Sequence, residues 1–511
     1  METFLGVMNA IASMDWQLWL LLVVGIVFGL VIGVLPGLTF VMGVLLILPF
    51  TYGMEPEAGI VLMLAAYVAG TYGGALTAIL LHIPGEPNNV PLLWDGWQMN
   101  RRGRAAEALG WTATAAFVGG LVSWVVLTFA AKPFAEVALR FSSSEYFLIV
   151  LLGLTSVLAL TGHSIVKALM TLVGGMLLAT IRVDKVYAAV RFDFGTTILR
   201  DGVNYLAVMV GVYALGEVLK RYGERFAGAN PAQPGKIKTA IPGLRALRER
   251  SGSLARGTAV GATMGIVPGA GATVGSFVAY GLEKQFGRFR RDVGNASPNG
   301  VIGPQAASTA TVGTALIPML VLGIPGSAAT AVIMGALLLH NIQPGPQIFT
   351  TQPDLVYTII GSLLVGLVLM FILGVAMVKP MISMLKVPEI YIGAFVVLFA
   401  YVGAFALRQS MSDVWIMTGF GILAVFMIRG DYPLAPLVLG AILGPLAERH
   451  LQTAMISSAG DWSIFVTRPI SLVLTLIWVV VLGFLVWKSV QQSRTTRTPE
   501  RPSAEAGSRT P

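Results

Sequence analysis

The 511-residue sequence contains no cysteine, only four histidines and only 12% charged residues. Without cysteine, the chain can form no disulfide, thiolate nucleophile or cysteine-ligated metal site. The histidines are scattered without the spacing of metal ligands, so no zinc centre is expected. Soluble domains carry about 25% charged residues. A chain with 55% hydrophobic residues and a mean hydropathy of +0.78 cannot cover itself with polar surface, so lipid must surround it.

Positive charge is missing from the first part of the chain, where no Lys or Arg precedes Arg101. A cleavable signal peptide needs a basic segment before its apolar run, so none is expected here. The first apolar run, residues 16–35, is therefore expected to stay in the membrane as a spanning helix. The net charge of +9 comes from basic residues that lie between apolar runs. The positive-inside rule explains this placement more simply than binding to nucleic acid.

Long apolar runs dominate the rest of the sequence, and a run of about 20 residues is enough to cross a bilayer as a helix. The pattern predicts an all-α polytopic membrane protein with about a dozen passages and additional discontinuous or re-entrant helices. The long runs are residues 16–35, 58–83, 109–131, 146–160, 165–181, 205–219, 356–378, 390–407, 414–428 and 471–487; shorter or interrupted runs are 38–50, 257–280, 306–322, 327–340 and 434–443.

Two polar segments divide the chain. Residues 220–256 form a basic connector, expected in the cytoplasm, between a first membrane half (1–219) and a second half with C-terminal helices (257–487). Residues 488–511 lack aliphatic and aromatic bulk and are expected to form a disordered tail.

The two halves share a motif that contains proline followed by glycine. GVLPGLTFVMG (residues 33–43) aligns with GIVPGAGATVG (265–275), and TYGGALTAILLHIPGE (71–86) aligns with TVGTALIPMLVLGIPGS (311–327) with a one-residue gap. A single Pro-Gly in a membrane helix is more often a plain kink. Four of them, in two matching pairs and in the same order, predict an internal repeat.

The basic residues indicate how the two copies are oriented. Arg101, Arg102 and Arg104 follow both breaks of the first half, whereas Lys284 to Arg291 lie between the two breaks of the second half. The positive-inside rule places both clusters in the cytoplasm. Because they occupy different positions within their copies, the two repeats are expected to have inverted topology.

The Pro-Gly breaks predict a binding site near the middle of the membrane. Proline and glycine end one helix and let another begin, which exposes backbone N–H groups and the positive end of a helix dipole. Such ends favour anions, and hydroxyls with unwound carbonyls can coordinate Na⁺. For each single residue, close helix packing is the competing interpretation. The candidate residues are Pro36, Gly37, Thr39, Thr71, Gly73, Gly74, Pro84, Gly85, Pro268, Gly269, Gly271, Thr273, Ser308, Thr309, Pro325, Gly326 and Ser327.

Few ionisable residues lie near the breaks. Glu86 follows Pro84-Gly85 directly and is expected either to line the cavity or to cap a half-helix, although isolated acids at run ends are often only interfacial. His82 and Lys167 are expected to be buried and satisfied or to snorkel, rather than to relay protons. No cofactor is expected beyond a coupling Na⁺ or H⁺.

Nucleotide binding is excluded by spacing. From Gly269 the pattern is G-x-G-x-x-x-G without a strand–helix frame, and no G-K-S/T sequence follows. Nothing resembles a hydrolytic triad, so an enzyme acting on lipid-linked substrates is disfavoured. A passive anion channel or pore stays open as an alternative to a transporter.

These residues resemble one known family, the large membrane subunit of the tripartite tricarboxylate transporters. The similarity extends to about Trp487 and is most specific in YGGALTAILLHIPGEP (72–87), DGWQMNRRGRAAEALG (95–110), GIVPGAGATVGSFVAYGLEK (265–284) and LGIPGSAATAVIMGALLLHNIQPGP (322–346). The resemblance implies a bacterial inner-membrane importer of carboxylates, driven by a cation gradient. Its implied partners are a small membrane subunit of about four helices and a periplasmic solute-binding protein.

The sequence departs from that family at three places. Gln305 stands where the family usually has an acid, and Ser308-Thr309 replace an asparagine pair. Ala75 replaces a serine, and His82 replaces an asparagine. The backbone motif is kept while the side chains around it differ, so the substrate could be a tricarboxylate, a dicarboxylate or an aromatic carboxylate.

Overall fold

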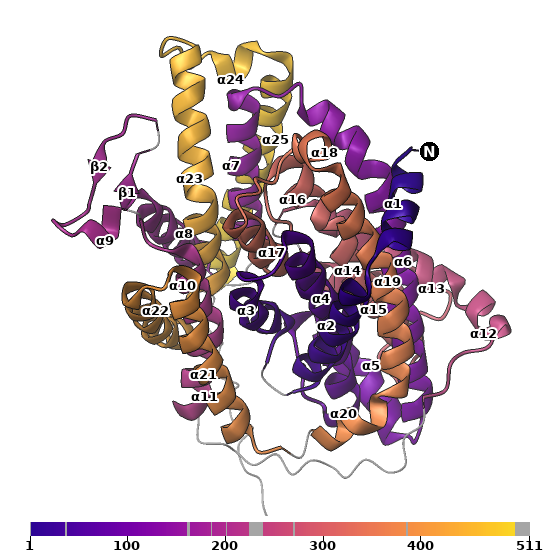
Figure 1. Cartoon of the computed structure of the whole chain (residues 1–511). Coiled ribbons are helices and arrows are strands. Elements are labelled where there is room, and N and C mark those ends of the chain that lie inside the picture. The colour runs from indigo at the N-terminus through magenta and orange to yellow at the C-terminus, as the bar shows by residue number, and fades with distance from the viewer. Residues whose placement is uncertain are drawn as a thin grey trace, which may run out of the picture.

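The computed structural model is a bundle of helices, and it describes residues 2–35, 38–160, 164–184, 186–200, 202–223, 239–268, 271–384 and 387–495 (Figure 1). The first helices are α1 (Glu2–Ser13), α2 (Trp16–Val34), α3 (Phe40–Thr51), α4 (Pro56–Leu81), the 3₁₀ helix η1 (Pro87–Asn89), α5 (Val90–Arg101), α6 (Ala105–Ala138), α7 (Ser143–Leu160) and α8 (Ile165–Thr180).

A short hairpin and several small helices follow. They are β1 (Arg182–Val183), β2 (Val190–Arg191), α9 (Thr197–Arg200), α10 (Tyr205–Met209), the π-helix η2 (Val210–Leu215), α11 (Gly216–Gly223) and α12 (Leu244–Glu249). The remaining helices are α13 (Ser251–Ile266), α14 (Gly271–Phe286), α15 (Asn299–Thr314), α16 (Leu316–Leu322), α17 (Ala328–Leu339), α18 (Ile348–Thr351), α19 (Pro353–Ala376), α20 (Val378–Met384), α21 (Glu389–Arg408), α22 (Met411–Arg429), α23 (Leu434–Ser457), α24 (Ile464–Thr467) and α25 (Pro469–Thr495).

Seven helical segments of the described chain are long and apolar enough to cross a membrane. They comprise α2, α4, α6, α15 with α16, α19, α22 and α23, and α4 is the most deeply buried of them. Shorter apolar helices of 10–17 residues, among them α3 and α17, accompany these spans. The predicted all-α membrane architecture is thus confirmed in its coarse form.

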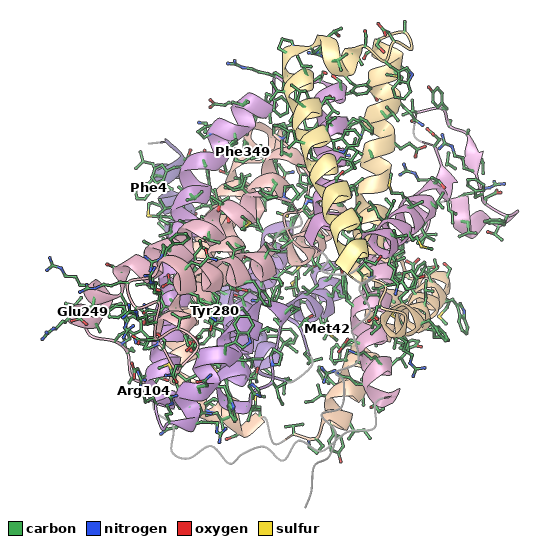
Figure 2. All side chains as sticks on the ribbon, turned by 180° about the vertical axis from the view of Figure 1, so that it is seen from behind. Phe4, Met42, Arg104, Glu249, Tyr280 and Phe349 are labelled. Atoms are coloured by element: carbon green, nitrogen blue, oxygen red, sulfur yellow. The ribbon has the colours of Figure 1, made fainter. Side chains whose placement is uncertain are left out.

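The helices pack in two groups. In one, α2 and α19 lie against α4, while α6, α13 and α14 lie against α15. In the other, α7 and α8 pack on α23, and α25 packs on α7. Helix α24 lies at one end of the molecule, and α12, which carries Glu249, projects from the side of the molecule (Figures 1 and 2). The half-helices α3 and α17 pack on each other.

Glycines let helix backbones touch at the interior of the first group. A Cβ on Gly29 of α2 would lie 2.3 Å from the Ala66 carbonyl oxygen of α4. In the second half, a Cβ on Gly261 of α13 would lie 2.1 Å from the Ala307 carbonyl oxygen of α15. Membrane helices pack closely through small residues four positions apart, because lipid offers no hydrophobic drive for helix association.

A buried carboxylate joins the two basic clusters. Asp95 of α5 is fully buried and accepts hydrogen bonds from the backbone N–H of Ser297 (2.7 Å), from that of Gly294 (2.9 Å) and from the Tyr280 hydroxyl (3.0 Å). Next to it, Arg104 donates to the Ala296 carbonyl (3.1 Å). The turn between α5 and α6 therefore lies against the loop after α14, so both basic segments are at one end of the molecule.

The hairpin of β1 and β2 was not predicted from the apolar pattern. Val183 pairs with Val190 in an antiparallel register, and the hairpin stands away from the helices in Figure 1. Arg191 forms ion pairs with Asp184 of the turn and with Glu448 of α23. Two donors, the backbone N–H of Tyr187 and the side chain of Gln452, help to lower the pKa of Asp184 to about 2.

Substituting Gly29 with valine tests the close contact of α2 with α4. We expect Gly29→Val to destabilise the fold by about 3 kcal/mol, the upper end for an overpacked interior, because the side chain meets backbone that cannot yield. Thermal unfolding in detergent, followed by size-exclusion chromatography, measures the effect. The control is Gly281→Val, where nothing lies within 4 Å of the added Cβ. Equal melting temperatures for the two variants would contradict the packing argument.

Removing the Asp95 carboxylate tests the contact between the basic segments. Asp95→Ala leaves two backbone N–H groups and the Tyr280 hydroxyl without their acceptor, and each unpaired buried donor costs about 1–3 kcal/mol. We expect a lower melting temperature than for Asp354→Ala, which removes an exposed carboxylate at the start of α19. An unchanged melting temperature for Asp95→Ala would show that solvent satisfies these donors.

Candidate functional site

The first break leads into the half-helix α3, whose start is buried. Thr39 is its N-cap, and the Thr39 hydroxyl accepts a hydrogen bond from the Met42 N–H (3.2 Å). The carboxylate of Glu86 accepts from the Phe40 N–H, the first residue of α3. Both donors belong to the turn that no helical carbonyl can satisfy. Glu86, which follows the second break, therefore caps the half-helix that follows the first break.

The fourth break leads into α17, whose start is also capped. Ser327 and Thr330 form a capping box: the Ser327 hydroxyl accepts from the Thr330 N–H (3.2 Å), and the Thr330 hydroxyl accepts from the Ser327 N–H (2.8 Å). A Cβ on Gly326 would lie 2.7 Å from the Ala315 carbonyl oxygen. The buried Pro325-Gly326 turn is thus pressed against the junction of α15 and α16.

These two half-helix starts meet at Tyr67 in the middle of α4. The Tyr67 hydroxyl lies 3.3 Å from the Ser327 hydroxyl, and its ring centroid lies 5.3 Å from that of Phe40. Tyr67 is only 1% exposed. The positive ends of α3 and α17 therefore converge on one buried region, although the two helices are almost 300 residues apart at their starts.

The second break lies beside the helix that begins at the third break. After Pro84-Gly85, η1 packs on α14, the helix that follows the third break, and on α15. The Asn88 amide of η1 donates to the Ser308 hydroxyl of α15 (2.6 Å). A Cβ on Gly85 would lie 2.7 Å from Gly74 Cα and 3.1 Å from the Gly33 carbonyl oxygen. Gly74 and Gly85 are thus in backbone contact, and the Asn88 side chain links Ser308 to the segment that follows Gly85.

Two buried amide side chains that neighbour this hydrogen bond in the sequence have polar atoms without a hydrogen-bond partner. Both polar atoms of Asn89 and the Oε1 atom of Gln305 have no hydrogen-bond partner among the described residues. Gln305 uses its Nε2 atom to donate to the Thr309 hydroxyl (3.1 Å). Asn89 and Gln305 are fully buried. Because a buried unpaired polar atom is costly, this cluster is suited to a bound polar group.

Several other predicted residues satisfy their own helices. The Thr71 hydroxyl donates to the Val68 carbonyl of α4 (2.7 Å), and Gly73 packs against Gly33. In α14 the Ser276 hydroxyl donates to the Thr273 carbonyl (2.9 Å), a contact that involves the backbone of Thr273 and not its hydroxyl. The contacts of Thr71 and Gly73 are those that the packing interpretation expects, because the Thr71 hydroxyl has used its one proton within its own turn.

The third break is only partly described. The Pro268 carbonyl accepts a hydrogen bond from the Ser156 hydroxyl of α7 (2.5 Å), and Gly271 begins α14 with a φ of +55°. That left-handed conformation suits glycine. The predicted site residues Pro36, Gly37 and Gly269 lie outside the described residues.

Tyr67, Asn88 and Asn89 were not among the residues predicted from the sequence. A signal was present for each: Tyr67 is a hydroxyl in the middle of an apolar run, and a buried tyrosine needs a partner. The two asparagines follow directly after the second break. In the described residues, no group of three or more His, Asp or Glu side chains could hold a metal ion.

Comparisons with known proteins agree with this architecture. Residues 19–439 match the tripartite tricarboxylate transporter TctA family. An uncharacterized 52.8 kDa protein in the TAR-I ttuC' 3' region of Agrobacterium vitis is 35% identical over 474 residues, which is 92% of this chain and 93% of that protein.

A second relative is an uncharacterized protein in the TAR-II ttuC' 3' region of the same organism. It is 37% identical over 234 residues, covering 46% of this chain and 97% of that protein. No solved structure matches. The chain belongs to the tripartite tricarboxylate transporter TctA family, a membrane component of tripartite transporters.

Proposed function

We propose that the chain is the permease subunit of a binding-protein-dependent secondary transporter, which imports carboxylate anions by alternating access. The observation that carries this proposal is the convergence of the α3 and α17 starts at Tyr67. Two helix N-termini and two hydroxyls around one buried point favour a negatively charged ligand. A carboxylate is the ligand class that the family name supports.

Neutral side chains line the site where a family member would usually carry an acid. Gln305, Ser308 and Asn88 provide amide and hydroxyl groups, and Asn89 offers an unused donor and an unused acceptor. Such a set can bind a second carboxylate or a hydroxyl of the substrate. The cargo is therefore a tricarboxylate, a dicarboxylate or an aromatic carboxylate.

The halves are proposed to be inverted repeats that move around this site. Similar local geometry supports this: α2 and α13 end in extended residues, Leu35 and Val267. Helices α4 and α16 end in left-handed residues, His82 at φ 60° and Gly323 at φ 67°. The short apolar helices beside the seven long ones complete about a dozen passages, counting half-helices.

The basic segments around Arg104 face the cytoplasm in this proposal, and the end with α24 faces the periplasm. The membrane is the bacterial inner membrane. A periplasmic solute-binding protein delivers the carboxylate, a small membrane subunit of about four helices completes the permease, and a gradient of H⁺ or Na⁺ supplies the energy.

Uptake by the complete system tests the function. Cells that express this chain, the small subunit and the binding protein are expected to accumulate at least one of radiolabelled citrate, succinate and benzoate. Accumulation stops when the binding protein is omitted or when the H⁺ and Na⁺ gradients are collapsed. Uptake that persists without either gradient would instead indicate a passive channel.

Tyr67→Phe tests the convergence of the half-helices. It removes one hydroxyl at the meeting point, so we expect uptake to fall about tenfold, equivalent to one buried hydrogen bond. Size-exclusion chromatography is expected to show an unchanged profile. The control is Tyr52→Phe, whose side chain is 53% exposed. Full activity of Tyr67→Phe would place the substrate elsewhere.

A further inference from the structure

We infer that Glu86 carries the coupling proton and that its carboxylate fills, between substrates, the place of a substrate carboxylate at the start of α3. This inference rests on the proposed transport function. It adds the identity of the coupling ion, the residue that binds it and the reason why ion and substrate move together.

Glu86 differs from the other buried carboxylates of the described chain. Four of them pair with arginine: Glu145 with Arg468, Asp184 with Arg191, Glu283 with Arg256 and Asp413 with Arg408.

Asp95 has no arginine, but it accepts from two backbone N–H groups and a tyrosine hydroxyl. Glu86 is 7% exposed, and within the described residues it accepts from the Phe40 N–H alone. A buried carboxylate with one hydrogen bond and no cation is poorly stabilised as an anion, so it is suited to gain and lose a proton.

No basic side chain faces Glu86 from the helices around it. The helical residues of α2, α3, η1 and α17 include no Lys, Arg, His, Asp or Glu. Helix α4 contributes Tyr67 and Tyr72, while Glu57 lies in its opposite first turn. His82 of the preceding turn is stacked on Trp97.

The charges on the helices that pack on α3 and η1 are ion-paired, hydrogen-bonded or placed at helix ends. Arg408, in the last turn of α21, pairs with Asp413, and Glu283 of α14 pairs with Arg256. Lys284 of α14 lies in the last turn of that helix, at the end away from the break. Helix η2 contains no Lys, Arg, His, Asp or Glu. The described residues around Glu86 therefore offer its carboxylate no cationic side chain.

The start of α3 holds one negative charge both when the site is empty and when substrate is bound. Facing outward, the Glu86 carboxylate binds a proton from the periplasm and becomes a neutral acid, whose hold on the Phe40 N–H weakens. A substrate carboxylate then accepts from that N–H. After reorientation the substrate leaves, the acid releases its proton to the cytoplasm, and the Glu86 carboxylate returns to Phe40. One proton crosses with each substrate at this site.

Asn89 provides a second hydrogen-bonding group for this exchange of carboxylates. Its amide lies beside the break, because a Cβ on Gly74 would be 2.4 Å from Asn89 Nδ2 and 3.6 Å from Gly85 Cα. The amide is fully buried and both its polar atoms are unpaired. It can therefore donate to the substrate carboxylate and accept from the protonated Glu86 without giving up an existing hydrogen bond.

Proteoliposomes with both membrane subunits, and with the binding protein added outside, test the inference. Radiolabelled citrate, succinate and benzoate serve as probes, with exchange at equal pH and accumulation driven by an acidic outside measured separately. Glu86→Gln keeps an acceptor for the Phe40 N–H but cannot exchange a proton. We expect the ratio of accumulation to exchange to fall by at least about tenfold relative to the wild type, the size of an ordinary coupling between ligands.

Glu55→Gln is the matched control, since Glu55 is an exposed acid in the same half of the chain. It is expected to accumulate the probe like the wild type. Proton-driven accumulation by Glu86→Gln at the wild-type level would overturn the inference. So would a wild type that is driven by Na⁺ at constant pH but not by a pH gradient.

If Glu86→Gln has also lost substrate exchange, infrared difference spectroscopy on the purified membrane subunits tests directly whether Glu86 binds the proton. Adding the transported probe at constant pH is expected to produce a protonated-carboxyl band in the wild type and in Glu55→Gln, but not in Glu86→Gln. A wild type without this band refutes the inference and leaves the transport function intact. A wild type that takes up no probe under any gradient refutes the transport function itself.

Discussion

A backbone N–H that begins a helix inside a membrane has neither a helical carbonyl nor water to pair with, and leaving it unpaired costs several kilocalories per mole. The break before α3 creates such groups, and one neighbouring and one distant side chain satisfy them. The Thr39 hydroxyl accepts a hydrogen bond from the Met42 N–H. The carboxylate of Glu86, which follows α4 in the sequence, accepts from the Phe40 N–H. The placement of η1 near the start of α3 follows from this need, because Glu86, just before η1, must reach the Phe40 N–H.

Glycine makes this arrangement possible by removing side chains where backbones have to meet. Gly33, Gly74 and Gly85 come from three segments and touch at one place, so the second break can lie against α4 while Glu86 reaches α3. Packing and ligand binding thus use the same residue type at neighbouring positions. The predicted site residues fall into a packing group and a group that offers polar atoms. The glycines and Thr71 pack, whereas Thr39, Ser308 and Ser327 present polar groups at helix starts or across helices.

The sequence predicted much of the fold because apolar length and Pro-Gly breaks are local properties. Helices α2 and α4 and the interruptions before α14 and α17 lie where the runs predicted them. Partners across the chain could not be predicted, since nothing local to Tyr67 indicates that it meets Ser327, 260 positions away. The hairpin at Arg182–Val183 and Val190–Arg191 was missed for a similar reason. Ion pairs to α23 hold it, and such pairs leave no periodic pattern in the sequence.

The contact around Asp95 has a mechanical consequence. It fastens α5 of the first half to the loop after α14 of the second, with Arg104 bonded to the same loop. This contact holds α5 and the loop after α14 together, although Asp95 and Ser297 are 202 positions apart in the chain. A movement that opens the end of the molecule near Arg104 has to break these hydrogen bonds or carry both segments along as one unit.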